Sequence, residues 1–345
     1  MSVLDKYDLN EPEIPVPAVN LPSEGLVLLV GSSGSGKSTI LRQHFELDDI
    51  PFSANRLIDD FTSHERAEEL LIACGLRSIP TWVRAYSSLS NGEAHRAFCA
   101  RSIDVGREFI DEFSSVVDRD TAKSLAVALK KWFDRSEQKR LVVATCHRDI
   151  QDWLCPDAVY DTDQMAWESG RLLRRPRPHI TVEVTPCHGE TVWEHVKKHH
   201  YLSHNFNRSA NCWAATINGK LVGFTSVIAF PSGSLKDAWR EHRTVVVPEF
   251  QGLGIGNKLS EAVGDWVAST GGRYFSKTSH PAMGEHRNRS GQWRPTSKNG
   301  KNRLDYKSEG GAYHTASLQE RDKSRACYSH EYICEKGVDR DTKFN

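Results

Sequence analysis

The stretch LVLLVGSSGSGKST, residues 26–39, constrains the fold more than any other part of this chain. It satisfies the pattern G-x-x-x-x-G-K-[ST], directly after an apolar run of strand length and before a helical segment. Glycines let backbone N–H groups turn inward around phosphate oxygens, a lysine neutralises the terminal phosphates, and a hydroxyl can bind Mg²⁺. We therefore expect an α/β domain that binds a nucleotide at this first phosphate loop (residues 31–38), with contacts from Ser33, Gly34, Ser35, Gly36, Lys37, Ser38 and Thr39.

The composition is that of an ordinary globular protein. With 345 residues the chain is long enough for about two domains, and 38% of its residues are hydrophobic and 26% charged. No apolar run approaches the roughly 20 residues of a membrane-spanning helix, and the first residues lack a signal region. The eight cysteines form no CxxC pair, which favours reduced thiols. We therefore expect a soluble cytoplasmic protein.

Charge is distributed unevenly along the chain, although the net charge is zero. Residues 1–170 hold 18 Lys and Arg against 28 Asp and Glu, whereas residues 171–345 hold 27 against 17. The segment 273–325 alone has 12 basic and 5 acidic residues. Ordinary surface variation is one explanation, but an acidic and a basic half favour two domains with different partners.

Strand-like and helical segments alternate in two separate patterns. The first covers residues 20–173, after a proline-rich arm at residues 1–19, and predicts an α/β domain with buried parallel strands. RRPRPH, residues 174–179, has the composition of a linker. The second pattern, residues 180–345, includes the strands CWAATING and KLVGFTSVIAF, joined by an Asn-Gly turn. Within it, the basic insertion 280–318 is so rich in Gly, Ser, Asn, Arg and Lys that no regular structure is assigned to it.

Three segments after the first phosphate loop carry further chemistry. LSNGE contains Ser90 and Gly92, EFIDEFSSVVD contains Asp111 and Glu112, and VVATCHRD places His147 after an apolar strand. Alone, LSNGE could be a turn with a helix cap, and the histidine a core or capping residue. In this order behind the loop, however, they resemble the signature, the Walker B strand with its D-loop, and the switch histidine of ABC-type ATPases.

The resemblance to ABC-type ATPases covers about residues 20–172 and implies ATP binding and hydrolysis. Ser38 and Asp111 would hold Mg²⁺, Glu112 would polarise the attacking water, and His147 would be the switch residue. In this family the signature of one subunit, here with Ser90 and Gly92 as ATP contacts, completes the phosphate loop of another. A homodimer is therefore expected on ATP binding. The short spacing between loop and signature implies a reduced helical subdomain, which argues against membrane transport.

A second glycine-rich turn, in PEFQGLGIGNKLSEAV, leads into an amphipathic helix. As a dinucleotide fingerprint it lacks a third glycine, which would fall at Asn257, and a helix start without a ligand is the other alternative. Its spacing, Gln-x-x-Gly-x-Gly over residues 251–256, resembles the acyl-CoA loop of GNAT acyltransferases. The resemblance, over about residues 180–335, implies a mixed-sheet domain whose second phosphate loop (residues 251–256) and preceding strand hold acetyl-CoA or another acyl-CoA through Val245, Val247, Gln251, Gly252, Gly254 and Gly256.

Acyl transfer to an amine or hydroxyl requires deprotonation of the acceptor and protonation of the leaving thiolate. GNAT enzymes often use a tyrosine or an ordered water for these steps. Tyr201 is the candidate we place in the catalytic set, and Tyr274 and Ser279 are further candidates. His200 and His204 have the spacing of a metal pair, but without a third ligand motif, substrate-facing or solvent-facing histidines are the favoured interpretation.

The basic insertion mixes cationic and aromatic residues. Such interleaving can neutralise phosphates while aromatic rings stack on bases, although a solvated loop is the simpler interpretation. KHHYLSH followed by this segment also resembles the Mom-like GNAT proteins that modify DNA bases in phages. The residues expected to bind nucleic acid, DNA or RNA, are Arg287, Arg289, Trp293, Arg294 and Lys298.

Together these features predict an ATP-regulated acyltransferase that moves an acyl group from acyl-CoA to a nucleic-acid base, in phage or bacterial DNA modification. One alternative is acylation of a protein or a small amine. Another is a nucleotide-switched nucleic-acid binding module without transferase activity.

Overall fold

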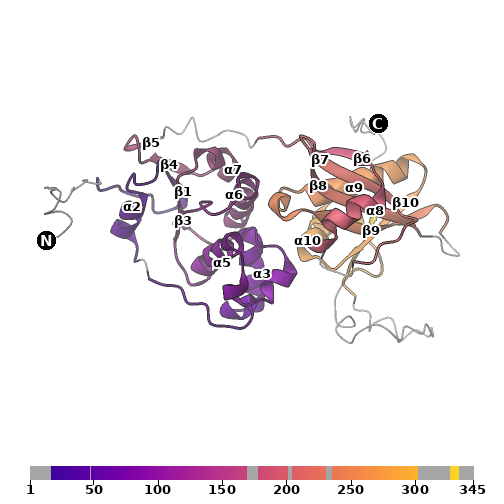
Figure 1. The fold of residues 1–345 in the computed structure, drawn as a ribbon, viewed down its shortest axis with the longest axis horizontal. Helices are drawn as coiled ribbons and strands as arrows, with labels where there is room; N and C mark the ends of the chain where they lie inside the picture. The colour runs from indigo at the N-terminus through magenta and orange to yellow at the C-terminus, as the bar shows by residue number, and fades with distance from the viewer. Residues whose placement is uncertain are drawn as a thin grey trace. The chain divides into compact units, whose positions relative to one another are not determined.

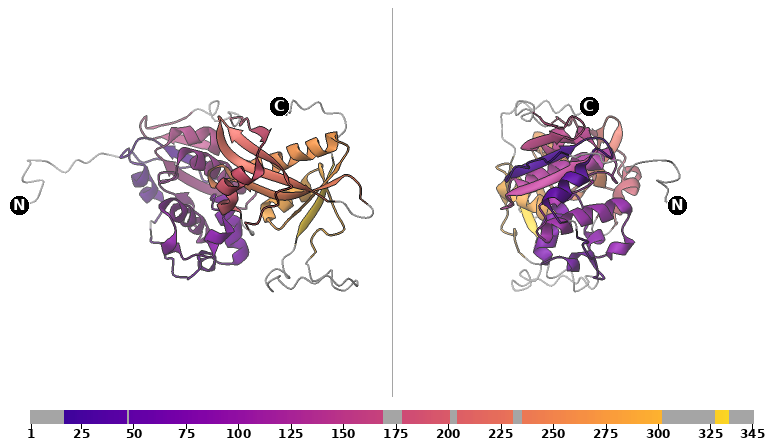
Figure 2. Two further views of the ribbon diagram at one scale, coloured as in Figure 1. Left: turned by 45° about the vertical axis from the view of Figure 1, so that its right-hand side comes forward. Right: turned by 90° about the vertical axis from the view of Figure 1, so that its left-hand side faces the viewer.

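The computed structural model describes residues 17–46, 48–168, 178–200, 204–230, 235–301 and 327–333. The chain divides into two compact units, Met1–His179 and Ile180–Asn345, and each is described by itself (Figures 1 and 2). The predicted arm up to residue 16, the linker residues 174–177, Tyr201 and residues 302–318 of the basic insertion lie outside the described residues. Within the described ranges, no helix is long and apolar enough to cross a membrane.

The first unit contains a five-stranded sheet with the order β2-β3-β1-β4-β5. Its first four strands are parallel, and β5 returns antiparallel to β4. The sheet confirms the expected α/β class. Its strands are β1 (Gly25–Val30), β2 (Phe109–Ile110), β3 (Arg140–Thr145), β4 (Ala158–Asp161) and β5 (Ala166–Trp167).

Alternation of side chains along β1 builds a core on each face of this sheet. Leu26 and Leu28 pack with α3, α5 and α6, whereas Val27 and Leu29 pack with α2 on the other face. Figure 1 shows α2 on the opposite side of β1 and β3 from these three helices. Because both faces are covered, β1 and β3 are apolar over nearly their whole length. The helices are α2 (Lys37–His44), α3 (His64–Ala73), α4 (Ile79–Trp82), α5 (Asn91–Asp104), α6 (Arg119–Phe133) and α7 (Gln151–Leu154).

The second unit contains a seven-stranded mixed sheet with the order β11-β12-β10-β9-β8-β7-β6. All neighbouring strands are antiparallel except β9 and β10, which pair in parallel over only Ala238–Arg240 and Arg273–Phe275. The strands are β6 (Glu183–Pro186), β7 (Asn211–Ile217), β8 (Lys220–Ala229), β9 (Ala238–Val246), β10 (Arg273–Thr278), β11 (Trp293–Pro295) and β12 (Tyr328–Tyr332).

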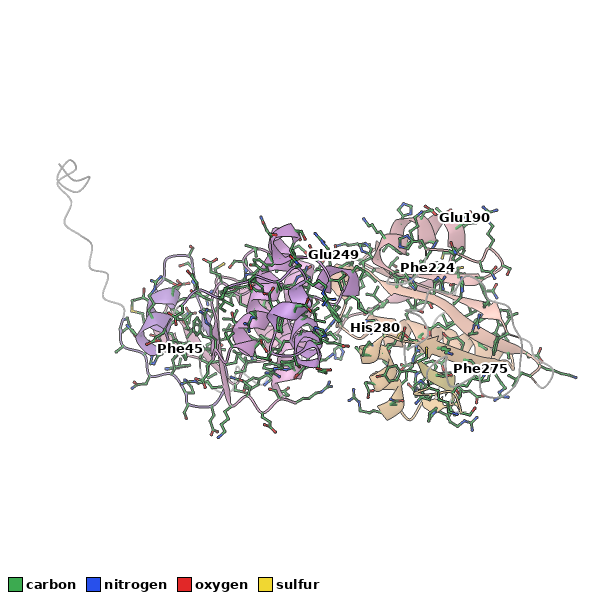
Figure 3. All side chains as sticks on the ribbon, turned by 90° about the horizontal axis from the view of Figure 1, so that it is seen from below. Phe45, Glu190, Phe224, Glu249, Phe275 and His280 are labelled. Carbon is green, nitrogen blue, oxygen red and sulfur yellow. The ribbon has the colours of Figure 1, made fainter. Side chains whose placement is uncertain are left out.

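Helices α8 (Gly189–Val196) and α9 (Ile255–Ser269) pack on this sheet through separate apolar clusters. Trp193 of α8 packs with Phe224 of β8, and Figure 3 shows Phe224 inside the unit and Glu190 of α8 at its surface. Val263 of α9 packs with Tyr274 of β10.

Part of the basic insertion is regular, which the sequence did not indicate. Residues 281–289 form α10 (Pro281–Arg289), and β11 pairs with β12. Gly284 allows α10 to lie against β12, because a Cβ at this position would come within 2.0 Å of the Tyr328 ring. Close packing on the sheet therefore outweighs the polar composition of this segment.

Candidate functional sites

The first phosphate loop has the backbone conformation that its sequence predicts. It begins after β1 and ends at Gly36, the N-cap of α2, whose φ of 92° is in the left-handed region that glycine adopts without strain. Lys37 donates to the carbonyl oxygens of Gly31 at 2.8 Å and Ser32 at 2.6 Å, and to Ser35 Oγ at 3.3 Å. The lysine ammonium therefore lies over the loop at the start of a helix, where backbone donors favour an anion.

The predicted Walker B residues follow the short strand β2. Since β2, β3 and β1 are parallel neighbours, their carboxyl ends bring Asp111, Glu112, His147 and the first phosphate loop to one edge of the sheet. Glu112 adopts a φ of 51°, and its N–H donates to Asp111 Oδ1 at 2.8 Å. The turn thus orients the Asp111 carboxylate against the backbone of Glu112, whose own side chain is exposed.

His147 is held by a serine that sequence reasoning missed. Ser114 Oγ lies 3.1 Å from His147 Nδ1 and 3.3 Å from Thr145 Oγ1. Burial lowers the pKa of His147, Arg119 lowers it further, and Asp149 opposes this. The imidazole is therefore neutral at pH 7, with Nδ1 on Ser114 and Nε2 as the nitrogen that remains for a ligand. Ser114 lies 33 positions from His147, and no local pattern marks the contact.

Ser90 begins helix α5 in a capping box. Its Oγ accepts from Glu93 N at 3.4 Å, and the Glu93 carboxylate accepts from Ser90 N at 3.0 Å. A Cβ at Gly92 would lie 3.4 Å from the carbonyl oxygen of Val116, so the start of α5 packs against the segment that follows Glu112. The helix cap considered from the sequence is present, and a helix N-terminus is also a position where an anion binds favourably.

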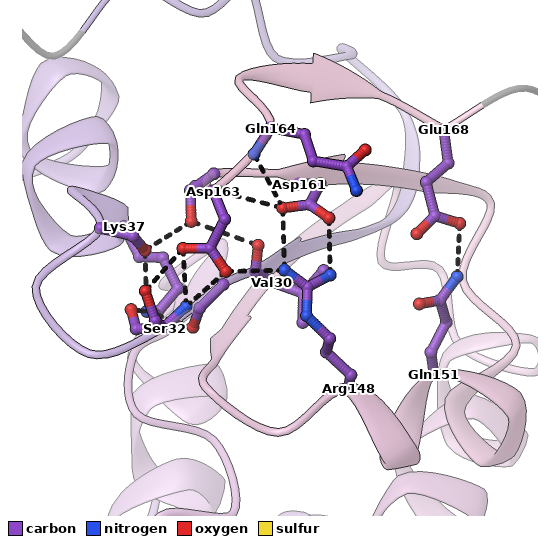
Figure 4. A network of polar contacts seen from close by, with 12 residues as sticks. Val30, Ser32, Lys37, Arg148, Gln151, Asp161, Asp163, Gln164 and Glu168 are labelled. Carbon is purple, nitrogen blue, oxygen red and sulfur yellow. Dashed lines mark hydrogen bonds and ion pairs between the residues drawn. The ribbon is translucent and has the colours of Figure 1, made fainter.

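A second missed feature is a charged network beside the first phosphate loop (Figure 4). Asp163, in the turn after β4, accepts from Ser32 N at 2.9 Å and from Ser32 Oγ at 2.6 Å. Arg148 donates to Asp161 at 2.6 Å and to Asp163 at 2.7 Å. The hydrogen bonds from Ser32, followed by that from Arg148, lower the pKa of Asp163 to about 2. Asp163 is therefore ionised at pH 7.

The donor set of the first unit suits magnesium bound together with phosphate. The described residues contain no group of three His, Cys, Asp or Glu that could hold a metal ion. Mg²⁺ usually takes one or two protein oxygens and completes its octahedron with phosphates and waters. The Ser38 hydroxyl and the Asp111 carboxylate would be those two oxygens, so the residues present fit the ion.

The second phosphate loop also ends at a left-handed glycine. Gly254, the N-cap of α9, has a φ of 89°, and Gly252 has a φ of 91°. Gln251 Nε2 donates to the carbonyl oxygen of Val246 at 2.9 Å, which ties the loop to the end of β9. A Cβ at Gly256 would lie 3.4 Å from Val246 Cγ2, so the first turn of α9 approaches the strand closely. Backbone donors of this turn are thus placed for an anion.

The strand that leads into this loop has one unpaired edge. Beyond Arg240 and Phe275, the described residues show no further pairing between β9 and β10. Val247 N donates to Val222 O at 3.0 Å, and Val245 pairs with Phe224. Since backbone groups alternate in direction along a strand, the groups of these two valines point toward β8.

The prediction of backbone contacts from Val245 and Val247 is therefore wrong by one register position. Thr244 and Val246 direct their backbone groups toward the open edge of β9, as the bond from Gln251 to Val246 O illustrates. The side chain of Val245 is buried on the face covered by α8.

Two residues predicted to bind nucleic acid are instead buried beneath this edge. Arg287 is 1% exposed and Trp293 is 4% exposed, and Arg287 Cζ lies 4.3 Å from the centre of the Trp293 ring. Arg287 pairs with Glu241 of β9 at 3.1 Å and donates to Ser260 Oγ at 2.9 Å. The prediction is wrong for Arg287 and Trp293, because an ion pair and ring packing fix both side chains in the interior.

The other three basic residues of the predicted set, Arg289, Arg294 and Lys298, are exposed. Arg294 pairs with Glu331 at 2.7 Å, and Arg273 pairs with the same carboxylate. Two cations share one acid here, so this edge of the sheet keeps a positive charge.

The remaining catalytic candidates are placed as follows. Tyr274 is 2% exposed, its hydroxyl lies 3.1 Å from Ser260 Oγ, and burial raises its pKa, so it is unsuited to proton transfer with a substrate. Ser279 is half-buried. His200 is buried with its ring against Trp193, which favours a core role over metal binding. A neutral base that the sequence did not indicate, His242 of β9, has a pKa lowered to about 4 by burial and by two neighbouring arginines.

Residues 174–288 match the family model described as the acetyltransferase (GNAT) family, so the second unit contains a GNAT acetyltransferase domain. This confirms the predicted family for that part of the chain. No curated protein matches the chain.

Solved structures of both predicted kinds resemble parts of the chain. An acetyltransferase from Bacillus subtilis in complex with CoA is 11% identical, with a TM-score of 0.34, and the match covers 45% of this chain and 100% of that one. The dimeric bacterial ABC transporter cassette MJ0796 is 20% identical, with a TM-score of 0.32, and the match covers 41% of this chain and 83% of that one. The ribosomal-protein-S18-alanine N-acetyltransferase of Escherichia coli is 12% identical, with a TM-score of 0.32, and the match covers 46% of this chain and 99% of that one.

Proposed function

We propose that the chain is an ATP-regulated acyltransferase whose second unit moves an acyl group from acyl-CoA to an acceptor, and whose first unit binds and hydrolyses Mg-ATP. The observation that carries this proposal is the continuity of the open edge of β9 with the glycine-capped start of α9. An extended strand edge can pair with the amides of a pantetheine arm, and the helix start can receive the pyrophosphate at its end.

The order of binding groups from the open edge of β9 to the start of α9 matches the order of chemical groups in acyl-CoA. The pyrophosphate would lie on the second phosphate loop and the pantetheine arm along Thr244 and Val246. The thioester would lie near the point where β9 and β10 separate. An acceptor amine would attack the thioester carbon, and the C–S bond would break to release CoA as a thiolate that takes up a proton. Glu241 is paired with Arg287 beneath this point, which keeps its pKa low and makes it a structural ion rather than the proton acceptor.

In the first unit, Lys37 would neutralise the terminal phosphates and Glu112 would polarise the attacking water. His147, neutral and oriented by Ser114, would contact the γ-phosphate through Nε2. Mg²⁺, held by Ser38 and Asp111, would stabilise the charge that develops on the phosphates. Because Ser90 and Gly92 begin a helix, a second copy of the chain could present that helix start to the same ATP, which makes an ATP-dependent homodimer part of the proposal.

For the acceptor we favour a nucleic-acid base, since exposed Arg289, Arg294 and Lys298 belong to a segment with 12 basic and 5 acidic residues. Phosphate contacts from these side chains would make affinity fall steeply with salt. Arg289→Ala should flatten the salt slope by about one unit for every sequence. Arg208→Ala is the control, because Arg208 is also exposed and pairs with Glu190 of α8.

The test of the whole proposal combines two readouts on the full chain. Release of free CoA thiol from acetyl-CoA is followed with DNA, RNA or a peptide pool as acceptor, and the products are identified by mass analysis of nucleosides and peptides. We expect thiol release together with a modified nucleoside. Modified peptides alone would move the acceptor to protein, and no thiol release with any acceptor would contradict acyl transfer.

A further inference from the structure

The end of β4 and the turn after it carry two carboxylates, Asp161 and Asp163, near a loop that is proposed to receive an anion. Asp163 accepts from the backbone N–H and the hydroxyl of Ser32, the second residue of the first phosphate loop. The contact between turn and loop is close. Thr162 Oγ1 lies 2.6 Å from Ser35 Oγ, and a Cβ at Gly31 would come within 2.1 Å of Thr162 Oγ1. The charge of Asp163 is thus held directly against the loop.

One guanidinium compensates this negative charge. Arg148 Nη1 donates to Asp161 Oδ2 at 2.6 Å, and Nη2 donates to Asp161 Oδ1 at 3.0 Å and to Asp163 Oδ2 at 2.7 Å. Asp161 is almost fully buried, whereas Arg148 and Asp163 are partly exposed. Arg148 directly follows His147, so the residue that neutralises the turn is covalently joined to the proposed switch residue.

The arrangement has a consequence for an anionic ligand. Without Arg148, the partly exposed carboxylate of Asp163 would lie uncompensated beside the triphosphate, with the buried carboxylate of Asp161 behind it. Like charges a few ångströms apart oppose each other even in a partly hydrated site. With Arg148 in place, Asp163 can hold Ser32 N–H and so shape the loop without repelling the ligand. A bidentate guanidinium suits this task because its planar fork fixes both carboxylates at once.

We propose that Arg148 is a positioning residue for nucleotide binding, which neutralises Asp161 and Asp163 so that Asp163 can brace the first phosphate loop beside the triphosphate. This inference rests on the proposed binding of Mg-ATP in the first unit. This role of Arg148 differs from a purely structural one, because the negative charge of Asp163 would repel the triphosphate once Arg148 is lost. Removing that charge should then repair the defect.

The experiment measures Mg-ATP affinity of the full chain by titration with a fluorescent ATP analogue at low and physiological salt. Arg148→Gln should weaken binding by roughly threefold to tenfold at low salt, and less at physiological salt. Asp163→Asn alone should change affinity little, since the amide oxygen still accepts from Ser32. The double variant Arg148→Gln/Asp163→Asn should recover most of the lost affinity.

Arg56→Gln is the matched control, because Arg56 also forms a two-point pair with an aspartate, Asp59, at a partly exposed site. If the double variant binds as weakly as Arg148→Gln, or if Arg148→Gln binds like the wild type, the inference is overturned. If the wild type itself binds no Mg-ATP, or Lys37→Ala leaves binding unchanged, the proposed nucleotide site fails and the inference fails with it. Thermal melts of each variant verify that the fold is retained.

Discussion

The two phosphate loops share a backbone and differ in their surroundings. Both end at a glycine N-cap, Gly36 with φ 92° and Gly254 with φ 89°, directly before a helix. The first loop has Lys37 over it, the acids Asp111 and Glu112 at the same sheet edge, and a partly exposed ion network.

The second loop has a different environment. No basic residue precedes Lys258 in α9, and Lys258 is paired with Glu261. An open strand edge adjoins the loop, and its ion pair, between Glu241 and Arg287, is buried beneath that strand. The backbone thus provides an anion site in both places, and the side chains decide which anion fits. A lysine with magnesium ligands suits a terminal triphosphate, whereas an open strand edge beside a helix start suits a pyrophosphate with an amide-containing arm.

The largest effect should come from Glu112→Gln, which removes the water-polarising carboxylate and keeps the side-chain shape. We expect ATP turnover to fall about 10²- to 10⁴-fold, with ATP and CoA binding retained and the chain held as a dimer in Mg-ATP. Phosphate release and light scattering measure the two effects. Glu137→Gln, at an exposed site, is the control. Undiminished turnover would remove Glu112 from the mechanism, and a variant that stays monomeric in saturating ATP would rule out the dimer.

The contrast between the two ion networks predicts unequal effects on stability. Arg287→Met leaves Glu241 buried without its counter-ion, so unfolding free energy should fall by about 3–5 kcal/mol. Arg148→Gln, at a partly exposed network, should change it by no more than about 1 kcal/mol. Urea unfolding followed by tryptophan fluorescence measures both. Glu241→Gln in the Arg287→Met background should recover part of the loss, and equal effects of the two arginine variants would contradict the contrast.

The second loop can be disabled separately by a charge. Gly254→Asp would place a carboxylate where the pyrophosphate should lie, and repulsion at about 4 Å should weaken CoA binding roughly tenfold to several hundredfold. Gly254→Asn is the matched control, because it has the same shape, tolerates positive φ and carries no charge. Calorimetry should show a much smaller loss for the Asn variant, with ATP affinity unchanged in both. Equal losses of CoA affinity in the two variants would mean that the shape of the new side chain, and not its charge, determines the effect.

A smaller effect is expected from Ser114→Ala, which removes the hydroxyl on His147 Nδ1. ATP turnover should fall about two- to tenfold, in line with one net hydrogen bond, and Ser269→Ala, at an exposed position of the second unit, is the control. Because folding lowers the pKa of His147, its neutral form persists as the pH falls to its ordinary value of 6.5 and is lost only at lower pH. The decline of wild-type turnover with falling pH should therefore have its midpoint below pH 6.5. A decline centred above pH 6.5 would argue against a neutral His147.

The features predicted correctly from the sequence are those written in consecutive residues. A glycine loop between a strand and a helix specifies its own backbone, so both loops and both fold classes could be recognised. The contacts that could not be predicted join distant positions. Asp163 and Ser32 are 131 positions apart, and only the pairing of β4 with β1 brings them together.

The predicted nucleic-acid contacts of Arg287 and Trp293, in the basic insertion, were wrong for a different reason. Composition alone treats each Arg and Trp as a surface residue, whereas Arg287 occupies the buried face of α10 together with Gly284. A glycine in a helical segment is a sign of close packing, and it was the available signal that this stretch lies on a sheet. The one-residue error at Val245 and Val247 has a similar origin, because the direction of a backbone group follows from strand pairing and not from the residue type.

The claim that the two loops bind two different ligands is tested most directly by titrating CoA into the wild type and the Lys37→Ala variant. Binding is measured by calorimetry, with and without excess Mg-ATP. The test is demanding because CoA itself contains a phosphorylated ADP moiety that could enter the first phosphate loop. The account predicts that CoA binds with a stoichiometry of one per chain in the wild type and in Lys37→Ala, and that Mg-ATP does not displace it. Loss of CoA binding in Lys37→Ala, or its displacement by Mg-ATP in the wild type, would place both ligands in one site and contradict the account.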